Sequence, residues 1–180
     1  MTKILIIVDM QNDFITGPLG NDDCRNAVKG CVELAKSDEF AYTIYTRDTH
    51  FDDYMGSLEG QKLPVPHCIH ETDGWQLIPE LDELQKSKHA FVVNKTTFGS
   101  TTRLNEVVNF LTQDLADDEF ELHFAGVCTS ICVISNIAIL RAWYPNTRIV
   151  LHKNATGDVT QDQKEAAFTV AKSIQCEVED

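Results

Sequence analysis

The chain of 180 residues has the length of one domain and the composition of a folded globular protein. Hydrophobic residues make up 43% and charged residues 24%, which excludes the collagen-like, disordered and disulfide-scaffold classes. The formal net charge of -13 disfavours nucleic acid and anionic membranes as partners, because both are bound by clustered Lys and Arg.

The N-terminal apolar run and the cysteines bear on the compartment. The run at 4–8 is too short for a secretory signal and much too short to span a bilayer. The six cysteines show no C-x-x-C spacing, and without a signal they do not indicate a disulfide framework. We therefore expect a reduced, soluble, cytoplasmic protein that forms a single domain over residues 1–180.

Short apolar runs alternate with helical patterns along the whole chain. In chain order, the predicted elements are strand 3–8, helix 24–36, strands 41–46 and 90–93, helix 104–111, strand 121–126, helix 131–143, strand 148–151, helix 163–174 and a weaker strand at 176–178. This alternation predicts an α/β fold, a three-layer αβα sandwich with a central, mainly parallel sheet. Residues 47–89 are predicted to be irregular, and so long an irregular stretch is more often functional than idle.

Candidate chemistry lies at the carboxyl ends of the predicted strands, where open parallel sheets bind their ligands. Asp9 ends the first strand, Asp48 and His50 follow the second, and Lys95 follows the third. The segment 126–132 follows the fourth strand. We expect these residues, distant in sequence, to lie along one edge of the sheet.

The segment 125–133 joins a strand to a helix and places a cysteine in the first helical turn. Thr129 or Ser130 is available as the N-cap, and Cys132 follows. A thiol there faces backbone N–H groups and the positive helix end, which stabilise a thiolate and can also receive an oxyanion. An isolated cysteine is more often a core residue. The charged residues at the neighbouring strand ends favour a nucleophile instead.

Asp9 and Lys95 are the candidate partners of this thiol. An Asp beside a cysteine can take the thiol proton and return it to a leaving amine. Lys95 can keep Asp9 ionised and lower the pKa of the thiol. The alternatives without catalytic function are a turn residue for Asp9 and a solvated surface lysine for Lys95.

A second candidate site combines imidazoles with carboxylates. Asp48 and His50, at i and i+2, project to the same side of an extended chain. His67 lies in a proline-stiffened loop that can supply a third ligand, and Glu59 is a candidate fourth. Such a donor set suits one divalent transition metal ion, zinc first, with iron or manganese as alternatives.

Taken together, these residues resemble the isochorismatase-like cysteine hydrolases, and within them the nicotinamidases, over essentially the whole chain. The resemblance is carried by short motifs in a fixed order: DMQNDF at 9–14, RDTH at 47–50, PHC at 66–68, TDG at 72–74, Lys95 before FGS at 98–100, and GVCTSICV at 126–133. It implies a six-stranded parallel sheet flanked by helices.

The resemblance also implies a mechanism. Asp9, Lys95 and Cys132 would form the catalytic triad, and the cysteine would form a thioester with an amide carbonyl and release ammonia. A cis peptide before Cys128 would turn its N–H toward the oxyanion, beside the N–H of Cys132. Water would then hydrolyse the acyl-enzyme.

The resemblance assigns the remaining residues to the metal and the substrate. Residues matching Asp48, His50 and His67 hold a metal that contacts the pyridine nitrogen, and Glu59 is the candidate for an additional carboxylate ligand. Phe14 matches an aromatic residue of the substrate pocket, and Trp75 and Tyr54 are further candidates for the pocket.

Two departures from the family motifs bear on the substrate. Thr49 stands where the family usually has Trp, and Thr129-Ser130 replaces the common Thr-Asp. The leading expectation is a metal-containing nicotinamidase that acts on a small-molecule amide. The alternatives are a related hydrolase of ureido or carbamoyl amides and a non-catalytic binding module, with a redox role for Cys128 and Cys132 as a minor option. The resemblance is also compatible with a homo-oligomer.

Overall fold

A six-stranded, entirely parallel sheet forms the centre of the computed structural model, which describes residues 1–180. Its strands are β1 (Thr2–Val8), β2 (Tyr42–Asp48), β3 (Ala90–Lys95), β4 (Phe120–Val127), β5 (Arg148–Gly157) and β6 (Glu177–Glu179). Their order in space is β3-β2-β1-β4-β5-β6. The chain therefore reverses its direction of winding between β1 and β4, and ligands bind beyond the carboxyl ends of the strands at such a point.

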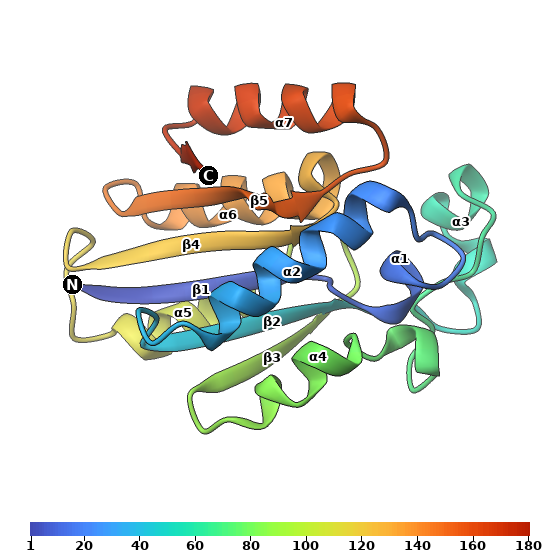
Figure 1. Cartoon of the computed structure of the whole chain (residues 1–180), viewed down its shortest axis with the longest axis horizontal. Coiled ribbons are helices and arrows are strands. Elements are labelled where there is room, and N and C mark those ends of the chain that lie inside the picture. The colour runs from blue at the N-terminus through green and yellow to red at the C-terminus, as the bar shows by residue number, and fades with distance from the viewer.

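Helices cover both faces of the sheet, as Figure 1 shows, so the predicted three-layer α/β architecture is confirmed. One face carries α2 (Asp22–Lys36) and α4 (Pro79–Asp82). The other face carries α5 (Arg103–Thr112), α6 (Ile134–Trp143) and α7 (Gln161–Ser173). Two short helices, α1 (Asn12–Ile15) and α3 (Leu58–Lys62), lie beyond the carboxyl ends of the strands. None of these helices has both the length and the apolar character needed to cross a bilayer.

Local sequence explains where the longest helix begins and which face it buries. The Asn21 side chain caps α2 by accepting a hydrogen bond from the Cys24 backbone N–H at 3.0 Å. Two aspartates in the first turn and Lys36 in the last complement the helix dipole. Cys24, Ala27 and Cys31 recur at helical spacing and are buried against the sheet.

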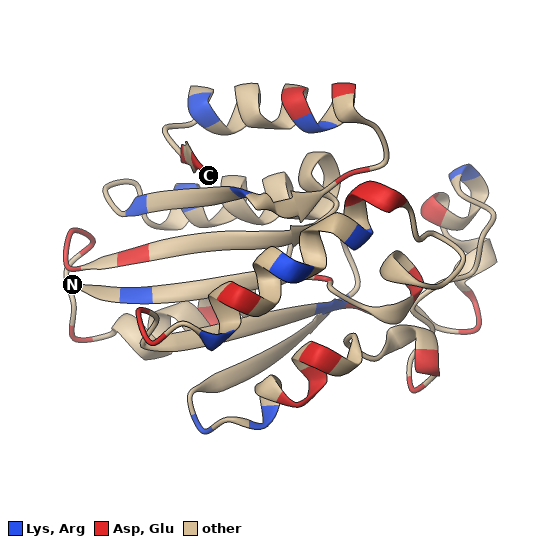
Figure 2. Cartoon of the chain, viewed as in Figure 1, with Lys and Arg blue, Asp and Glu red and all other residues tan.

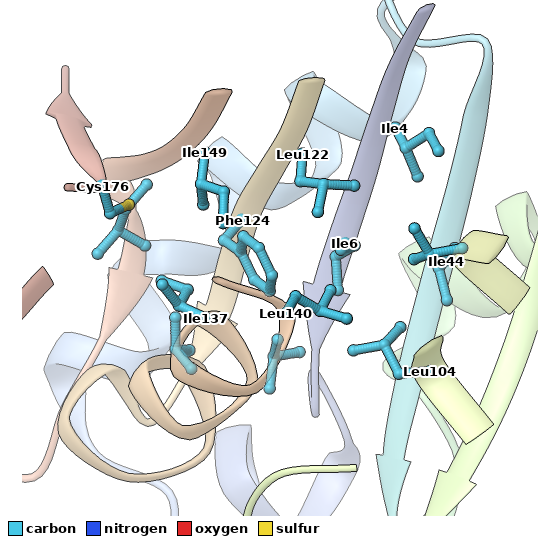
Figure 3. Close-up of a cluster of buried hydrophobic side chains, with 14 of the residues drawn as sticks. Ile4, Ile6, Ile44, Leu104, Leu122, Phe124, Ile137, Leu140, Ile149 and Cys176 are labelled. Carbon is cyan, nitrogen blue, oxygen red and sulfur yellow. The ribbon is translucent and has the colours of Figure 1, made fainter. Parts of the chain in front are cut away.

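The sheet is buried on both faces, which is why its strands are continuous apolar runs in the sequence. In β1, Ile4 and Ile6 face the cluster beneath α5, α6 and α7, whereas Leu5 and Ile7 face the opposite layer. Figure 3 shows Phe124 of β4 in the first cluster, together with side chains of α5 and α6. Most of the ionisable side chains lie outside these clusters, and in Figure 2 the basic residues occur singly among acidic ones on helices, loops and strand ends.

The structure differs from the predicted elements in three places. The irregular stretch at 47–89 contains α3, α4 and the 3₁₀ turns Tyr54–Gly56, Asp73–Trp75 and Leu84–Lys86. β5 continues to Gly157, past the polar residues at 152–154 that end its apolar run. The first residues of the predicted helix 131–143 belong to a π-helical turn, Thr129–Val133, and the α-helix itself begins at Ile134. Cys128 occupies the N-cap position of that turn, so neither Thr129 nor Ser130 is the N-cap.

Candidate active site

Four polar side chains from different segments meet at the carboxyl edge of the sheet. Asp9 follows β1, Asp48 ends β2, Lys95 ends β3, and Cys132 lies in the π-helical turn after β4. All four are buried. Parallel strands place their carboxyl ends at one edge, so the predicted convergence of these residues is present in the structure.

The ammonium group of Lys95 is the common contact of this cluster. Its Nζ lies 2.6 Å from Asp9 Oδ2, 3.4 Å from Asp48 Oδ1 and 3.7 Å from Cys132 Sγ. Burial by itself lowers the pKa of Lys95, but the carboxylates of Asp9 and Asp48 outweigh burial and raise it. Lys95 is therefore a buried cation at neutral pH and not the solvated surface lysine of the alternative interpretation.

Asp9 is held so that one carboxylate oxygen faces the lysine and the thiol. The Thr46 hydroxyl donates to Asp9 Oδ1 at 2.6 Å, and the Asp9 backbone N–H donates to the Thr46 carbonyl at 3.2 Å. Asp9 Oδ2 is paired with Lys95 and has no hydrogen bond of regular geometry, which leaves it a free lone pair. Burial raises the pKa of Asp9 against the lowering by Lys95, so this carboxylate is more basic than its ion pair alone would make it.

Cys132 lies in the π-helical turn, which closes on the Cys128 carbonyl. The N–H groups of Ile131 and Val133 both donate to the Cys128 carbonyl at 3.1 Å, and the Val127–Cys128 peptide is cis, as the resemblance implied. Gly126 has a φ of +110°, and a Cβ there would lie 2.1 Å from the Val8 carbonyl oxygen. Glycine is thus required for β4 to pass β1 immediately before the turn.

The surroundings of Cys132 favour the neutral thiol, whereas the helix N-terminus was expected to stabilise a thiolate. Burial raises the pKa of Cys132 well above its ordinary value, and the lowering by Lys95 does not offset it. The negative charges of Asp9 and Asp48 raise it further. Lys95 Nζ lies 2.6 Å from Asp9 Oδ2 and 3.7 Å from Cys132 Sγ, so the carboxylate and the sulfur flank the same ammonium, and Asp9 is the candidate acceptor of the thiol proton.

The four predicted metal-ligating side chains lie together beside this cluster. Asp48, His50, Glu59 and His67 each offer one ligand atom, and these atoms all lie within 4.8 Å of one another. His50 Nε2 is 3.0 Å from Asp48 Oδ2 and 3.6 Å from Glu59 Oε1. His67 Nε2 is 3.6 Å from Asp48 Oδ2 and 3.7 Å from Glu59 Oε1. The chain therefore has a group of residues capable of binding a metal ion.

Hydrogen bonds around these side chains favour metal binding. His67 Nδ1 donates to the Val65 carbonyl at 2.8 Å, which leaves Nε2 with its lone pair toward the group. Lys95 and the two imidazoles hold the pKa of Asp48 well below its usual range, although burial opposes them. Two imidazole nitrogens and two carboxylate oxygens are a donor set that zinc, iron and manganese accept.

The three aromatic candidates for the pocket occupy different positions. The Phe14 ring packs edge-on against His67 with centroids 5.4 Å apart, and Tyr54 packs against His50 at 4.7 Å. Trp75 instead donates from Nε1 to Thr49 Oγ1 at 2.9 Å, and the Arg47 guanidinium lies 3.6 Å above its ring. Phe14 and Tyr54 thus border the group of candidate metal ligands, whereas Trp75 contacts Arg47, Thr49 and His70.

Gln11 is a buried residue of the site that the sequence analysis missed. Its Nε2 donates to the carbonyls of Asp48 and Trp75 at 2.9 and 2.8 Å, and its Oε1 accepts from the Asp48 N–H at 2.7 Å. One amide therefore fixes the backbone of Asp48, a candidate metal ligand. The signal was its position two residues after Asp9, within the first motif.

Asp13 has a similar function for a second segment of the site. Its Oδ2 accepts the Cys68 N–H at 2.7 Å, next to His67. Gly74 passes so close that a Cβ there would lie 2.2 Å from Asp13 Oδ2. Through Gln11 and Asp13, the first motif thus contacts the segment with Asp48 and the loop with Cys68, which follows His67.

Comparisons with known proteins place the chain in one family. The family model of the isochorismatase domain matches residues 3–180. The isochorismatase family protein PncA of Bacillus subtilis (strain 168) is 30% identical over 174 residues, which cover 90% of each chain. The crystal structure of nicotinamidase/pyrazinamidase PncA from Bacillus subtilis, 28% identical, has a TM-score of 0.82 over 100% of both chains.

Two further relatives extend the comparison. The nicotinamidase/pyrazinamidase of Mycobacterium tuberculosis is 26% identical over 188 residues, covering 97% of this chain and 98% of its own. A pyrazinamidase of Pyrococcus horikoshii, crystallised in complex with zinc, shares the fold with a TM-score of 0.78 at 19% identity, covering 99% of this chain and 98% of its own. Because the family model spans nearly the whole chain and the relatives are similar over most of their length, the chain belongs to the isochorismatase family.

Proposed function

We propose that the protein is a metal-containing cysteine amidohydrolase that converts nicotinamide and water to nicotinate and ammonia, within a single domain over residues 1–180. The observation that carries this proposal is the set of contacts of Lys95, whose ammonium group touches Asp9, Asp48 and Cys132 at once. The relatives named nicotinamidase support the choice of substrate.

In the proposed reaction, Cys132 Sγ attacks the amide carbonyl carbon while Asp9 Oδ2 accepts the thiol proton. The carbonyl oxygen becomes an oxyanion that the backbone N–H groups of Cys128 and Cys132 stabilise. The C–N bond then breaks, and Asp9 returns the proton to the departing nitrogen, which leaves as ammonia. Water hydrolyses the remaining thioester to the carboxylate and restores the thiol.

Lys95 has an electrostatic role in this sequence. When the thiol proton moves to Asp9, negative charge passes from the carboxylate to the sulfur and then to the carbonyl oxygen. A fixed ammonium near both the carboxylate and the sulfur stabilises each of these positions in a buried site.

Asp48, His50, His67 and Glu59 would hold one divalent transition metal ion, which we assign as zinc, with iron and manganese compatible with the same donors. When bound, such an ion supplies a Lewis acid that can orient the ring nitrogen of a pyridine substrate. Phe14 and Tyr54 would form the aromatic walls beside it, with Trp75 supporting the wall from behind.

The experiment measures ammonia released from nicotinamide by purified protein, together with its metal content. We expect turnover in the wild-type protein, about one metal ion per chain, and loss of turnover in Cys132→Ala with an unchanged melting temperature. A panel of ureido and carbamoyl amides separates the two amidase hypotheses, since faster hydrolysis of one of these would reassign the substrate. Full activity in Cys132→Ala would disprove the nucleophile assignment.

A further inference from the structure

The carboxylate of Asp158 lies fully buried directly after β5 and contacts the turn that carries Cys132. Its Oδ2 accepts the backbone N–H of Ser130 at 2.6 Å, and its Oδ1 accepts the Ser130 hydroxyl at 3.0 Å. Both acceptor atoms of this side chain thus bind one residue, which lies midway between Cys128 and Cys132.

Asp158 is itself held by neighbouring elements. Its backbone N–H donates to Asp23 Oδ2 of α2 at 2.8 Å, and Asp23 in turn lies 3.0 Å from Lys164 Nζ of α7. The Val159 N–H donates to Asp158 Oδ1 at 2.8 Å. The backbone of Asp158 is therefore held by Asp23 of α2, which pairs with Lys164 of α7, and the Val159 N–H orients the carboxylate.

Two further contacts limit the movement of the same turn. The Thr129 hydroxyl donates to the Gly157 carbonyl at 3.0 Å, next to the Asp158 contact. At the other end, the amide of Asn136 donates to the Cys132 carbonyl at 2.8 Å. The turn is thus held at both ends, and Asp158 supplies the charged hydrogen bonds near its beginning.

We propose that Asp158 is a positioning residue for the nucleophile: by binding Ser130, it sets where the backbone N–H groups of Cys128 and Cys132 point. This inference rests on the proposed function, because those groups matter only if they receive an oxyanion. Charge-assisted hydrogen bonds to a buried carboxylate are short and strong, so they determine the conformation of the segment that they bind. A displacement of about 1 Å in such a segment can cost about 100-fold in rate.

The test compares Asp158→Asn and Ser130→Ala with wild-type protein. Glu121→Gln is the matched control, since Glu121 is also buried and bound to side chains, here His123 and Arg148, near the start of β4. For each variant we would measure kcat and KM for nicotinamide per folded molecule. The rate of Cys132 alkylation by iodoacetamide, followed by peptide mass spectrometry, is the second readout.

We expect Asp158→Asn to lower kcat by about 10- to 100-fold with KM changed less than about threefold. Ser130→Ala keeps the backbone hydrogen bond and should lose less, about 3- to 10-fold. Alkylation of Cys132 should change more than about threefold in Asp158→Asn and stay unchanged in the control.

Several outcomes would overturn the inference. A folded Asp158→Asn variant with kcat within twofold of wild type would do so, as would a rise in KM with kcat unchanged. If Asp158→Asn does not fold, Ser130→Ala decides, and an unchanged kcat there contradicts the role. If wild-type protein hydrolyses no amide, the proposed function fails, whereas the alkylation rates still test whether Asp158 positions Cys132.

Discussion

The ion pair between Lys95 and Asp9 allows a prediction in which one variant loses both stability and activity, and a second variant regains stability alone. Lys95→Met removes the ammonium but keeps a side chain of similar length. Both groups are almost fully buried and 2.6 Å apart, so the substitution leaves the Asp9 carboxylate buried without its cation. Breaking a buried pair in this way costs about 3–5 kcal/mol, a large part of the about 5–15 kcal/mol by which domains are stable.

A second variant tests the cause of that loss. Lys95→Met combined with Asp9→Leu removes both charges, and apolar replacements of a buried pair are often close to neutral in stability. We expect the double variant to recover at least half of the lost free energy of unfolding and to remain inactive. Asp48 also loses its contact with Lys95 in the double variant and keeps only those with His50 and His67, which is why full recovery is not expected.

The assay is urea denaturation followed by circular dichroism, in the presence of a chelator so that metal binding does not add to stability. Lys29→Met is the control, because Lys29 forms an exposed pair with Glu33 and should change the free energy of unfolding by less than about 0.5 kcal/mol. The loss in Lys95→Met should shrink toward acid pH as Asp9 becomes protonated. A loss below about 1 kcal/mol at neutral pH would refute the argument.

Three further predictions concern the neighbouring contacts. Gln11→Leu leaves the N–H and carbonyl of Asp48 and the carbonyl of Trp75 without partners, so we expect a loss of at least about 3 kcal/mol in urea denaturation; a loss under about 1 kcal/mol would show that water replaces the amide. His67→Ala should lower the metal content from about one ion per chain to near zero by elemental analysis, and retention of the ion would remove His67 from the ligand set. Burial and the nearby His123 lower the pKa of His152 to about 4. Between about 6.5 and 4 the unfolded chain binds more protons than the folded one, so stability is present above this range and is lost as pH falls through it. His152→Gln should reduce this pH dependence in thermal melts, and an unchanged slope would contradict it.

The sequence predicted those parts of the site that lie at strand ends. Asp48 and Lys95 could be placed side by side because parallel strands bring their carboxyl ends to one edge, whatever their separation in sequence. The same rule would have found Asp158, but β5 contains polar residues at 152–154, and its apolar run stops six residues early. Asp158 was therefore missed because the predicted end of this one strand was wrong.

Other features depend on three-dimensional contacts that no local pattern contains. Burial raises the pKa of Cys132 by more than the charge of Lys95 lowers it. The residues adjacent in sequence do not reveal how deeply one side chain is buried. In the sequence, Gln11 is an ordinary polar residue. Its importance follows from the fold, which brings the carbonyls of Asp48 and Trp75 within hydrogen-bond distance of its side chain. Glu59 was a candidate ligand from its residue type and again from the resemblance to a family, but its distances from the histidines follow only from the fold.

Asp48 has one oxygen toward Lys95 and the other toward the two histidines. A single side chain thus serves both halves of the site, and no substitution at this position can alter one half while sparing the other. Tyr54 and Glu59 come instead from the segment between β2 and α4, outside the strand ends that carry Asp9 and Lys95, so we expect differences in substrate preference to arise in that segment.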